Sequence, residues 1–216
     1  NLTPSEMLGQ IISAQRDTGE RISNVVMMGI GEPLDNYDNT IKFLRLVSSE
    51  NGLNIGLRHI SLSTCGVVDR INDLANEELP ITLSISLHAY DNEVRSSIMP
   101  INNKYSIEVL LSACNDYFNK TGRRISFEYT LIANKNDDLD GAVALARLLK
   151  KYIKGPCHVN LIPLNEVKET GLGTSKNANA FKNKLASLGI NATIRRRLGA
   201  DINASCGQLR HTKGEH

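Results

Sequence analysis

The sequence contains little that points to a membrane, to a disulfide-rich secreted fold or to a locally encoded metal site. No apolar run approaches the roughly 20 residues of a transmembrane helix, and no signal peptide opens the chain. The four cysteines, Cys65, Cys114, Cys157 and Cys206, show no CxxC or CxxxCxxC spacing, which excludes a compact zinc or iron–sulfur motif within the chain. We therefore expect reduced thiols, a cytoplasmic location and no association with membranes.

Strong net charge is also missing, since 25 basic and 23 acidic residues leave a formal charge of +2. That value does not by itself indicate a nucleic-acid partner. The arginines at 195–197 could hold phosphates or could form a solvated edge strand, and no aromatic residues are interleaved with them as in a stacking platform for single strands. The chain starts at Asn1 rather than at Met, so we expect a piece to be missing in front of it.

What is present is a regular alternation of strand-like and helix-like segments with short connections. Strand patterns occupy residues 22–34, 58–66, 80–89, 124–133, 158–165 and 191–199, and helical patterns occupy 3–19, with Ser5 as the expected cap, 39–50, 70–78, 106–122, 139–152 and 177–189. Such alternation predicts a single domain, 1–216, built on a parallel sheet with right-handed crossovers. A doubly wound sheet and a TIM-like barrel both fit, but no GxGxxG motif follows an early strand, which weighs against a dinucleotide-binding sheet.

Polar residues near the ends of the predicted strands favour the barrel. They are the Gly31–Glu32 pair, Ser61, Ser63, Ser84, Ser86, His88, Glu128, Asn160 and Asn165. In a parallel barrel these ends meet at one rim, where ligands bind. The alternative is that each residue caps its own loop. We predict an α/β fold, a partial (β/α) TIM-like barrel with parallel strands and outer helices, and a polar cavity at its rim.

Several of these residues suit particular ligand groups. Glu32, next to the flexible Gly31, could accept hydrogen bonds from an ammonium group, or it could be a solvated residue in a tight turn. Ser86 and His88 lie two apart on one strand face and could bind a carboxylate or a ribose, although a hydrogen-bonded core histidine is equally compatible. Asn165 follows a strand and can both donate and accept.

Cys206 stands apart in the small, polar stretch ADINASCGQLR. Small neighbours give access to the thiol, and the arginines of the preceding strand would favour the reactive thiolate. The alternative is a small buried apolar residue, which is the usual setting of an isolated cysteine. Residues alone leave these two possibilities open.

Six motifs occurring in order resemble the bacterial radical SAM RNA adenine-C2 methyltransferases. They are NVVMMGIGEPL, LSTCGVV, ISLHA, MPINNKY, NLIPLN and GADINASCGQL, and the resemblance as a whole runs from Asn1 almost to Gln208. The GEPL spelling, with Pro33, is more similar to the housekeeping C2 enzymes than to the C8-methylating resistance relatives. The resemblance implies a radical SAM type of barrel that methylates C2 of one adenine in 23S ribosomal RNA and of one in tRNA.

The resemblance also implies residue roles. Gly31 and Glu32 would hold the methionine end of S-adenosylmethionine, and Cys206 would accept a methyl group and carry it to the RNA. The rest of the cofactor site would be formed by Ser63, Ser86, Leu87, His88 and Asn165. A second S-adenosylmethionine would be cleaved reductively by a 4Fe-4S cluster, with electrons from a donor such as flavodoxin, and a second cysteine would release the product through a disulfide. The enzyme would act as a monomer.

Four features of that family are absent from the sequence. The CxxxCxxC segment that binds the cluster, the first strand, the resolving cysteine and an RNA-binding domain all precede the equivalent of Asn1 in the family, so we expect this chain to be an inactive fragment without metal ligands. The alternatives are a cluster-free RNA-binding or scaffold protein and a C8-specific relative.

Overall fold

The computed structural model describes residues 1–28, 31–164 and 173–195. In these ranges the chain forms one six-stranded parallel sheet whose strands follow one another in chain order. The strands are β1 (Val25–Met27), β2 (Ile60–Thr64), β3 (Thr82–Ser86), β4 (Ile125–Leu131), β5 (Cys157–Pro163) and β6 (Ala192–Ile194). A doubly wound sheet reverses its strand order at a switch point, and this sheet does not. The predicted partial barrel is therefore confirmed.

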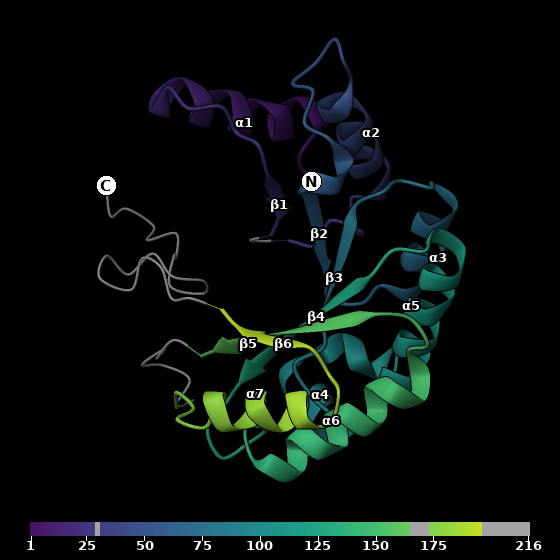
Figure 1. Ribbon diagram of the computed structural model, residues 1–216. Helices are drawn as coiled ribbons and strands as arrows, with labels where there is room; N and C mark the ends of the chain where they lie inside the picture. The colour runs from purple at the N-terminus through teal and green to yellow at the C-terminus, as the bar shows by residue number, and fades with distance from the viewer. Residues whose placement is uncertain (29–30, 165–172, 196–216) are drawn as a thin grey trace, which may run out of the picture.

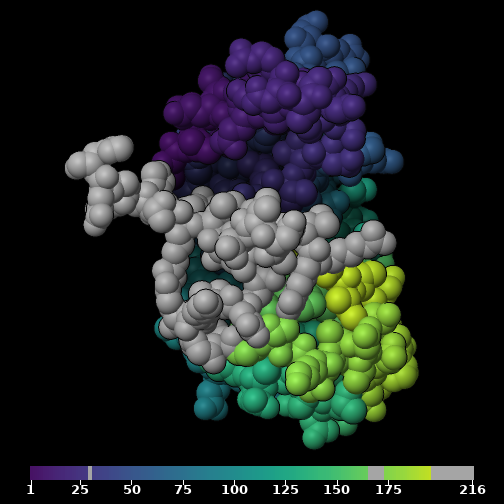
Figure 2. All heavy atoms as spheres, turned by 90° about the vertical axis from the view of Figure 1, so that its left-hand side faces the viewer, coloured from purple at the N-terminus to yellow at the C-terminus, as the bar shows by residue number. Residues whose placement is uncertain are grey.

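The described ranges contain seven α-helices and two short 3₁₀ helices. They are α1 (Pro4–Thr18), α2 (Tyr37–Ser48), α3 (Val68–Asn76), α4 (Asn92–Ile98), α5 (Ile107–Thr121), α6 (Leu139–Tyr152), α7 (Ala178–Ser187), η1 (Leu57–His59) and η2 (Pro100–Asn103). Helix α1 precedes β1, and the others connect successive strands. Figure 1 shows the helices on the outer side of the curved sheet. The N-terminal elements and the C-terminal helices lie at opposite ends of the molecule, as the view turned by 90° also shows (Figure 2).

Two details of the helices differ from the sequence prediction. The cap of α1 is Thr3 rather than Ser5: the Thr3 side chain accepts from the Glu6 N–H, the Glu6 carboxylate accepts from the Thr3 N–H, and Pro4 takes the first helical position. Helix α4 was not predicted at all. It has only seven residues, too few for a clear apolar period, and its one sequence signal is Asp91, whose side chain accepts from the Val94 N–H.

The two faces of the sheet differ in polarity. Register pairs Ser86 with Glu128, Glu128 with Asn160 and Asn160 with Thr193, so these polar side chains lie on one face across four strands. The intervening residues on the other face are fully buried against the helices, and they include Leu83, Ile85, Phe127, Tyr129, Val159 and Leu161. Burial of each such side chain stabilises the fold by about 1.5–3 kcal/mol. The apolar face therefore holds the fold together and leaves the polar face for a ligand.

The curvature of the sheet brings its two ends toward each other. Arg195, directly after β6, places a guanidinium nitrogen 4.0 Å from the sulfur of Met28, directly after β1. Both side chains lie on the polar side of the sheet, because Met28 and Arg195 continue the alternation that places Val26 beside Ser61 and Thr193 beside Asn160. A polar interior surface of this kind distinguishes the domain from a barrel filled with apolar side chains.

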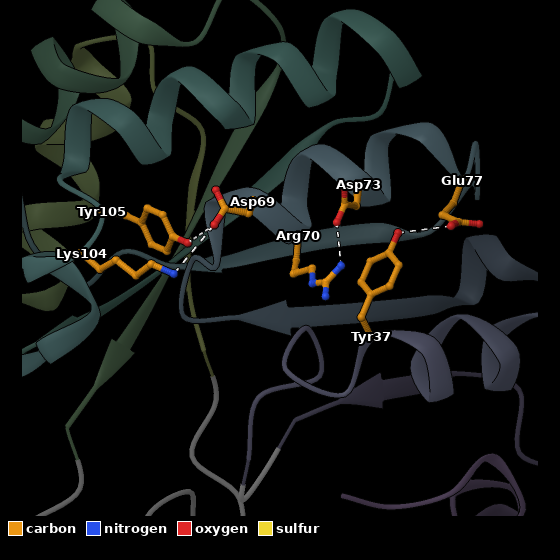
Figure 3. Close-up of polar contacts among 7 residues, drawn as sticks. All are labelled: Tyr37, Asp69, Arg70, Asp73, Glu77, Lys104 and Tyr105. Carbon is orange, nitrogen blue, oxygen red and sulfur yellow. Dashed lines mark hydrogen bonds and ion pairs between the residues drawn. The ribbon is translucent and has the colours of Figure 1, made fainter.

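Helix α3, which follows the loop after β2, is held on both sides by polar contacts (Figure 3). Toward α2, the Tyr37 hydroxyl donates to Glu77 at 3.3 Å and the Arg70 guanidinium lies 5.1 Å from the centre of the Tyr37 ring. Toward the segment after η2, the Tyr105 hydroxyl donates to Asp69 at 2.5 Å. The contacts of Asp69 and Arg70 fix the start of α3 and with it the loop that leads out of β2, and the contact of Glu77 fixes the end of the helix.

Candidate functional site

A cavity of about 580 Å³ opens at the carboxyl ends of β1, β2 and β3. Four of the predicted site residues line it, namely Gly31, Glu32, Ser63 and Ser86. Its remaining wall contains side chains of α1 and α2 and the apolar residues of β1. The volume lies within the about 300–1,000 Å³ that small-molecule sites occupy. The structure thus brings half of the predicted site together in one hollow of suitable size.

Glu32 joins two strand ends at this cavity. Its Oε2 accepts from the Cys65 N–H at 2.8 Å, in the loop after β2, and its Oε1 accepts from the Leu34 N–H at 3.0 Å, in its own loop. The side chain is therefore neither a freely solvated carboxylate nor only a local cap. Each carboxylate oxygen has a second lone pair, so the group can still accept from a ligand ammonium. Gly31 has a φ of +106°, a backbone conformation that L side chains avoid.

The Glu32→Gln substitution tests this link between strands. The amide nitrogen of glutamine would meet a backbone N–H where a carboxylate oxygen now accepts, so we expect a loss of about 1–3 kcal/mol in the free energy of unfolding. Urea denaturation measures this change. Glu50→Gln, at an exposed position, is the matched control and should change the unfolding free energy by less than about 0.5 kcal/mol. Equal behaviour of the two variants would show that the contacts of Glu32 do not stabilise the fold.

Ser63 and Ser86 lie half-buried on the polar face, at the ends of β2 and β3. Ser84, the register partner of Ser63, is buried and shares a hydrogen bond of 3.1 Å with Ser61. Ser61 and Ser84 thus use their hydroxyls in a hydrogen bond with each other. Ser63 and Ser86 line the cavity, and their hydroxyls can donate to or accept from a bound molecule.

Leu87 and His88, directly after β3, are tied into the backbone. The N–H groups of both residues donate to the Glu128 carbonyl, at 3.0 and 3.2 Å, and the Leu87 side chain is fully buried. The His88 Nδ1 accepts from the Thr130 N–H at 3.0 Å, at a φ of +57°. Burial, with a smaller effect of the nearby Arg95 cation, lowers the pKa of His88 to about 4, so that the ring is neutral at pH 7. Ligand contacts of these two residues stay predictions.

A chain of polar side chains continues across the second half of the sheet. Glu128 is buried and accepts from Asn160 at 2.8 Å, Thr193 donates to Asn160 at 3.0 Å, and His158 lies 2.9 Å from the Thr193 hydroxyl. Burial raises the pKa of Glu128. Sequence patterns indicated Glu128 and Asn160 but missed Thr193 and His158, for which the register across β5 and β6 is the only signal.

Two of the predicted site residues, Asn165 and Cys206, lie outside the described residues, as do Arg196 and Arg197. Their roles stay predictions.

The three described cysteines do not form a place for an iron–sulfur cluster. Cys65, Cys114 and Cys157 are free thiols, and across residues 1–28, 31–164 and 173–195 no group of three or more cysteine, histidine or acidic side chains could hold a metal ion. Burial, together with Glu32, raises the pKa of Cys65 to about 12, and burial also raises the pKa of the other two thiols. A protonated thiol is neither a good metal ligand nor a nucleophile. The described part of the chain therefore does not fit a cluster.

The same residues do fit S-adenosylmethionine. The cavity combines a carboxylate for an ammonium group, hydroxyls on two strand ends for polar groups, and apolar walls from α1, α2 and β1 for a thioether chain or a base.

Among the helices of the described ranges, none is both long and apolar enough to cross a membrane.

A polar cavity at the carboxyl ends of parallel strands defines a ligand-binding domain of the (β/α)-barrel class. Residues 3–164 match the model of the Radical SAM superfamily, and the chain belongs to this superfamily. Proteins of the superfamily use S-adenosylmethionine and a 4Fe-4S cluster, so the family supports the cofactors that the sequence resemblance implied.

Its curated relatives include probable dual-specificity RNA methyltransferases RlmN from Clostridium perfringens strain 13, at 55% identity, and from Clostridium botulinum strain Eklund 17B, at 57% identity. Each alignment covers 98% of this chain and 61% of the relative, so the chain spans less than two thirds of the length of these proteins.

Two solved structures resemble the fold. A radical SAM methyltransferase from Sphaerobacter thermophilus superposes with a TM-score of 0.91 at 44% identity, covering 97% of this chain and 62% of that one. A domain of pyruvate-formate lyase-activating enzyme from Bacteroides vulgatus shares the fold alone, with a TM-score of 0.60 at 19% identity, covering 81% of this chain and all of that one.

Proposed function

We propose that this chain is the core of a radical SAM methyltransferase that methylates C2 of an adenine in 23S ribosomal RNA and in tRNA, through a methylated cysteine. The observation that carries the proposal is the meeting of Gly31, Glu32, Ser63 and Ser86 at one cavity, because the family motifs that contain them are far apart in sequence. The 55–57% identity to proteins described as dual-specificity RNA methyltransferases supports the RNA substrates.

The residues of the chain divide the binding of S-adenosylmethionine among them. Glu32 would accept from the ammonium of its methionine end, beside the Gly31 backbone, and Ser63 and Ser86 would offer hydroxyls. Leu87, His88 and Asn165 would complete the site. When bound with a reduced 4Fe-4S cluster, the cofactor supplies the one-electron chemistry that adenine C2 requires, since this carbon is not nucleophilic and ordinary methyl transfer would fail there. Cys206 would supply the sulfur that takes up the methyl group as a thioether.

The partners follow from the same proposal. The cluster ligands would come from a segment outside this chain, as would the resolving cysteine that forms a disulfide during product release. An electron donor such as flavodoxin would reduce the cluster, the enzyme would act as a monomer, and its RNA substrates place it in the cytoplasm. The whole chain, 1–216, would be a single radical SAM core domain lacking its first strand.

Reconstitution with iron and sulfide tests whether this chain can bind a 4Fe-4S cluster without the segment that would supply the ligands. We expect the 216-residue chain to gain neither visible cluster absorption nor stoichiometric iron, and to methylate no RNA, because no ligand set for a cluster is present in the described ranges. The complete protein, treated in parallel, should gain both properties. Stoichiometric iron and a cluster spectrum in the 216-residue chain would contradict the prediction.

A second candidate function is a cluster-free RNA-binding or scaffold protein, which the lack of a described ligand set favours. The coding sequence upstream decides between the two. A CxxxCxxC motif within a few tens of codons supports the methyltransferase, and its absence supports the scaffold. A C8-specific relative is distinguished by the position of the methyl group in the RNA product.

A further inference from the structure

Arg95, in helix α4, is a buried guanidinium that has no carboxylate partner among the described residues. The residue is 0% exposed, and no acidic side chain of the described ranges lies within ion-pair distance of it. Burial of an unpaired cation is costly unless hydrogen bonds replace its water. The acceptors of its hydrogen bonds therefore show which parts of the structure the buried guanidinium supports.

Three of its acceptors are backbone carbonyls at the ends of β2 and β3. Nη2 donates to the Cys65 carbonyl at 2.7 Å and to the Ser86 carbonyl at 3.1 Å, and Nε donates to the Leu87 carbonyl at 3.1 Å. Nη1 donates to the Asn102 side chain at 3.1 Å, so four of the five guanidinium N–H groups have partners. A planar fork with fixed donor directions is suited to hold several acceptors in one arrangement, whereas a lysine ammonium is not.

Asn102 holds the guanidinium from the other side. Its amide nitrogen donates to the Asn92 carbonyl, to the Asn92 side chain and to the Ser96 hydroxyl, at 3.1, 3.1 and 2.9 Å. These three contacts leave the amide oxygen of Asn102 facing Arg95. The direction of the fork is therefore set by α4 and η2 and does not depend on a ligand.

The hydrogen bonds of Arg95 continue into the cavity wall. The backbone of Cys65 accepts from Arg95 through its carbonyl and donates to the Glu32 carboxylate through its N–H. The ends of β1, β2 and β3 are thus connected in series, from Glu32 through Cys65 and Arg95 to Ser86. These are the three strand ends that supply the predicted residues of the cavity.

The loop at Cys65 has little room to adjust. Gly66 has a φ of +104°, and a Cβ at this position would come within 2.9 Å of the Leu110 side chain and 3.5 Å of Nη2 of Arg95. The backbone therefore passes close over the guanidinium, in a conformation that glycine permits. Loss of Arg95 would remove a hydrogen-bond donor from the carbonyls of Cys65, Ser86 and Leu87 in this confined space.

We propose that Arg95 is a positioning residue of the S-adenosylmethionine site, which holds the ends of β2 and β3, and through Cys65 the carboxylate of Glu32, in the arrangement that binds the cofactor. The inference rests on the proposed function, because it assigns Arg95 to the cofactor site proposed there. Arg95 acts through the backbone and through Glu32 and does not itself contact the reacting atoms.

Binding of S-adenosylhomocysteine to the complete protein, measured by calorimetry, tests the proposal. We expect Arg95→Ala to weaken binding about tenfold or more, as is typical when several buried acceptors lose their donor. Millimolar guanidinium chloride should restore part of the affinity of this variant, because the free ion can occupy the vacated place, whereas sodium chloride at equal concentration should not. Arg123→Ala is the control. Among the described residues, the one hydrogen bond of the Arg123 side chain goes to the carbonyl of Ile81, at 3.4 Å, and Ile81 precedes β3.

The outcomes separate the two proposals. A folded Arg95→Ala variant with wild-type affinity, or one whose lost affinity guanidinium does not restore, overturns the positioning role and leaves the proposed function standing. If that variant does not fold, Arg95→Lys takes its place, and a lysine variant with wild-type affinity overturns the role. Failure of the wild-type protein to bind S-adenosylhomocysteine overturns the proposed function and this inference with it.

Discussion

Replacement of Cys206 by alanine in the complete protein should abolish adenine methylation and leave RNA binding unchanged. In the proposed reaction the sulfur of Cys206 carries the methyl group, and alanine offers no atom that could form the thioether. Removal of a nucleophile that forms a covalent intermediate lowers turnover by on the order of 10³-fold or more. RNA affinity depends mainly on contacts with phosphates, to which one thiol contributes little. Mass spectrometry of the RNA product and a binding titration measure the two quantities.

Cys157→Ala is the matched control for this substitution. Cys157 is half-buried at the start of β5, distant in sequence from the motif that contains Cys206, and burial raises the pKa of its thiol. We expect this variant to methylate RNA at close to the wild-type rate. Methylation that persists in Cys206→Ala would remove the carrier role from Cys206, and equal loss in both variants would point to a general effect on folding.

The strands and most helices could be predicted from the sequence because their signals are local. The end of α5 at Gly122 is an example, since a φ of +65° at that position is the ordinary glycine termination of a helix. The start of α1 was placed two residues late, because Ser5 and Thr3 are both good caps and only the reciprocal bonds with Glu6 decide between them. The preference for a barrel over a doubly wound sheet rested on two signals. No GxGxxG motif follows an early strand, and polar residues stand near the ends of the predicted strands.

The candidate site was predictable as a set of residues and not as a set of contacts. Spacing identified Glu32, Ser63 and Ser86, because polar residues at successive strand ends converge in a parallel barrel. Nothing in the spacing showed that the Glu32 carboxylate would bind the Cys65 peptide. Arg95 escaped notice for the same reason: a single arginine in a short polar segment reads as a surface residue, and only the three-dimensional arrangement of carbonyls around it reveals its burial.

The stability of the chain should fall on acidification between pH 7 and pH 5 because of His88. Burial lowers the pKa of His88 in the folded state to about 4, against an ordinary value of 6.5. Above pH 6.5 both the folded and the unfolded states carry a neutral ring, so this histidine gives no pH dependence there. Below pH 6.5 the unfolded state binds a proton that the folded state does not, and stability is lost as the pH falls. The loss amounts to about 2 kcal/mol at pH 5 and about 3 kcal/mol at pH 4.

His88→Asn isolates this contribution. The asparagine side-chain oxygen can accept from the Thr130 N–H in place of Nδ1, and asparagine tolerates the φ of +57° better than most residues. It does not titrate, so the unfolding free energy of the variant should change by about 2 kcal/mol less than that of the wild type between pH 7 and pH 5. Use of this difference cancels the contributions of other groups, such as Glu128, whose raised pKa acts in the opposite direction. His59→Asn, at an exposed histidine, is the control, and an His88→Asn variant with the wild-type pH dependence would show that His88 is not the group responsible.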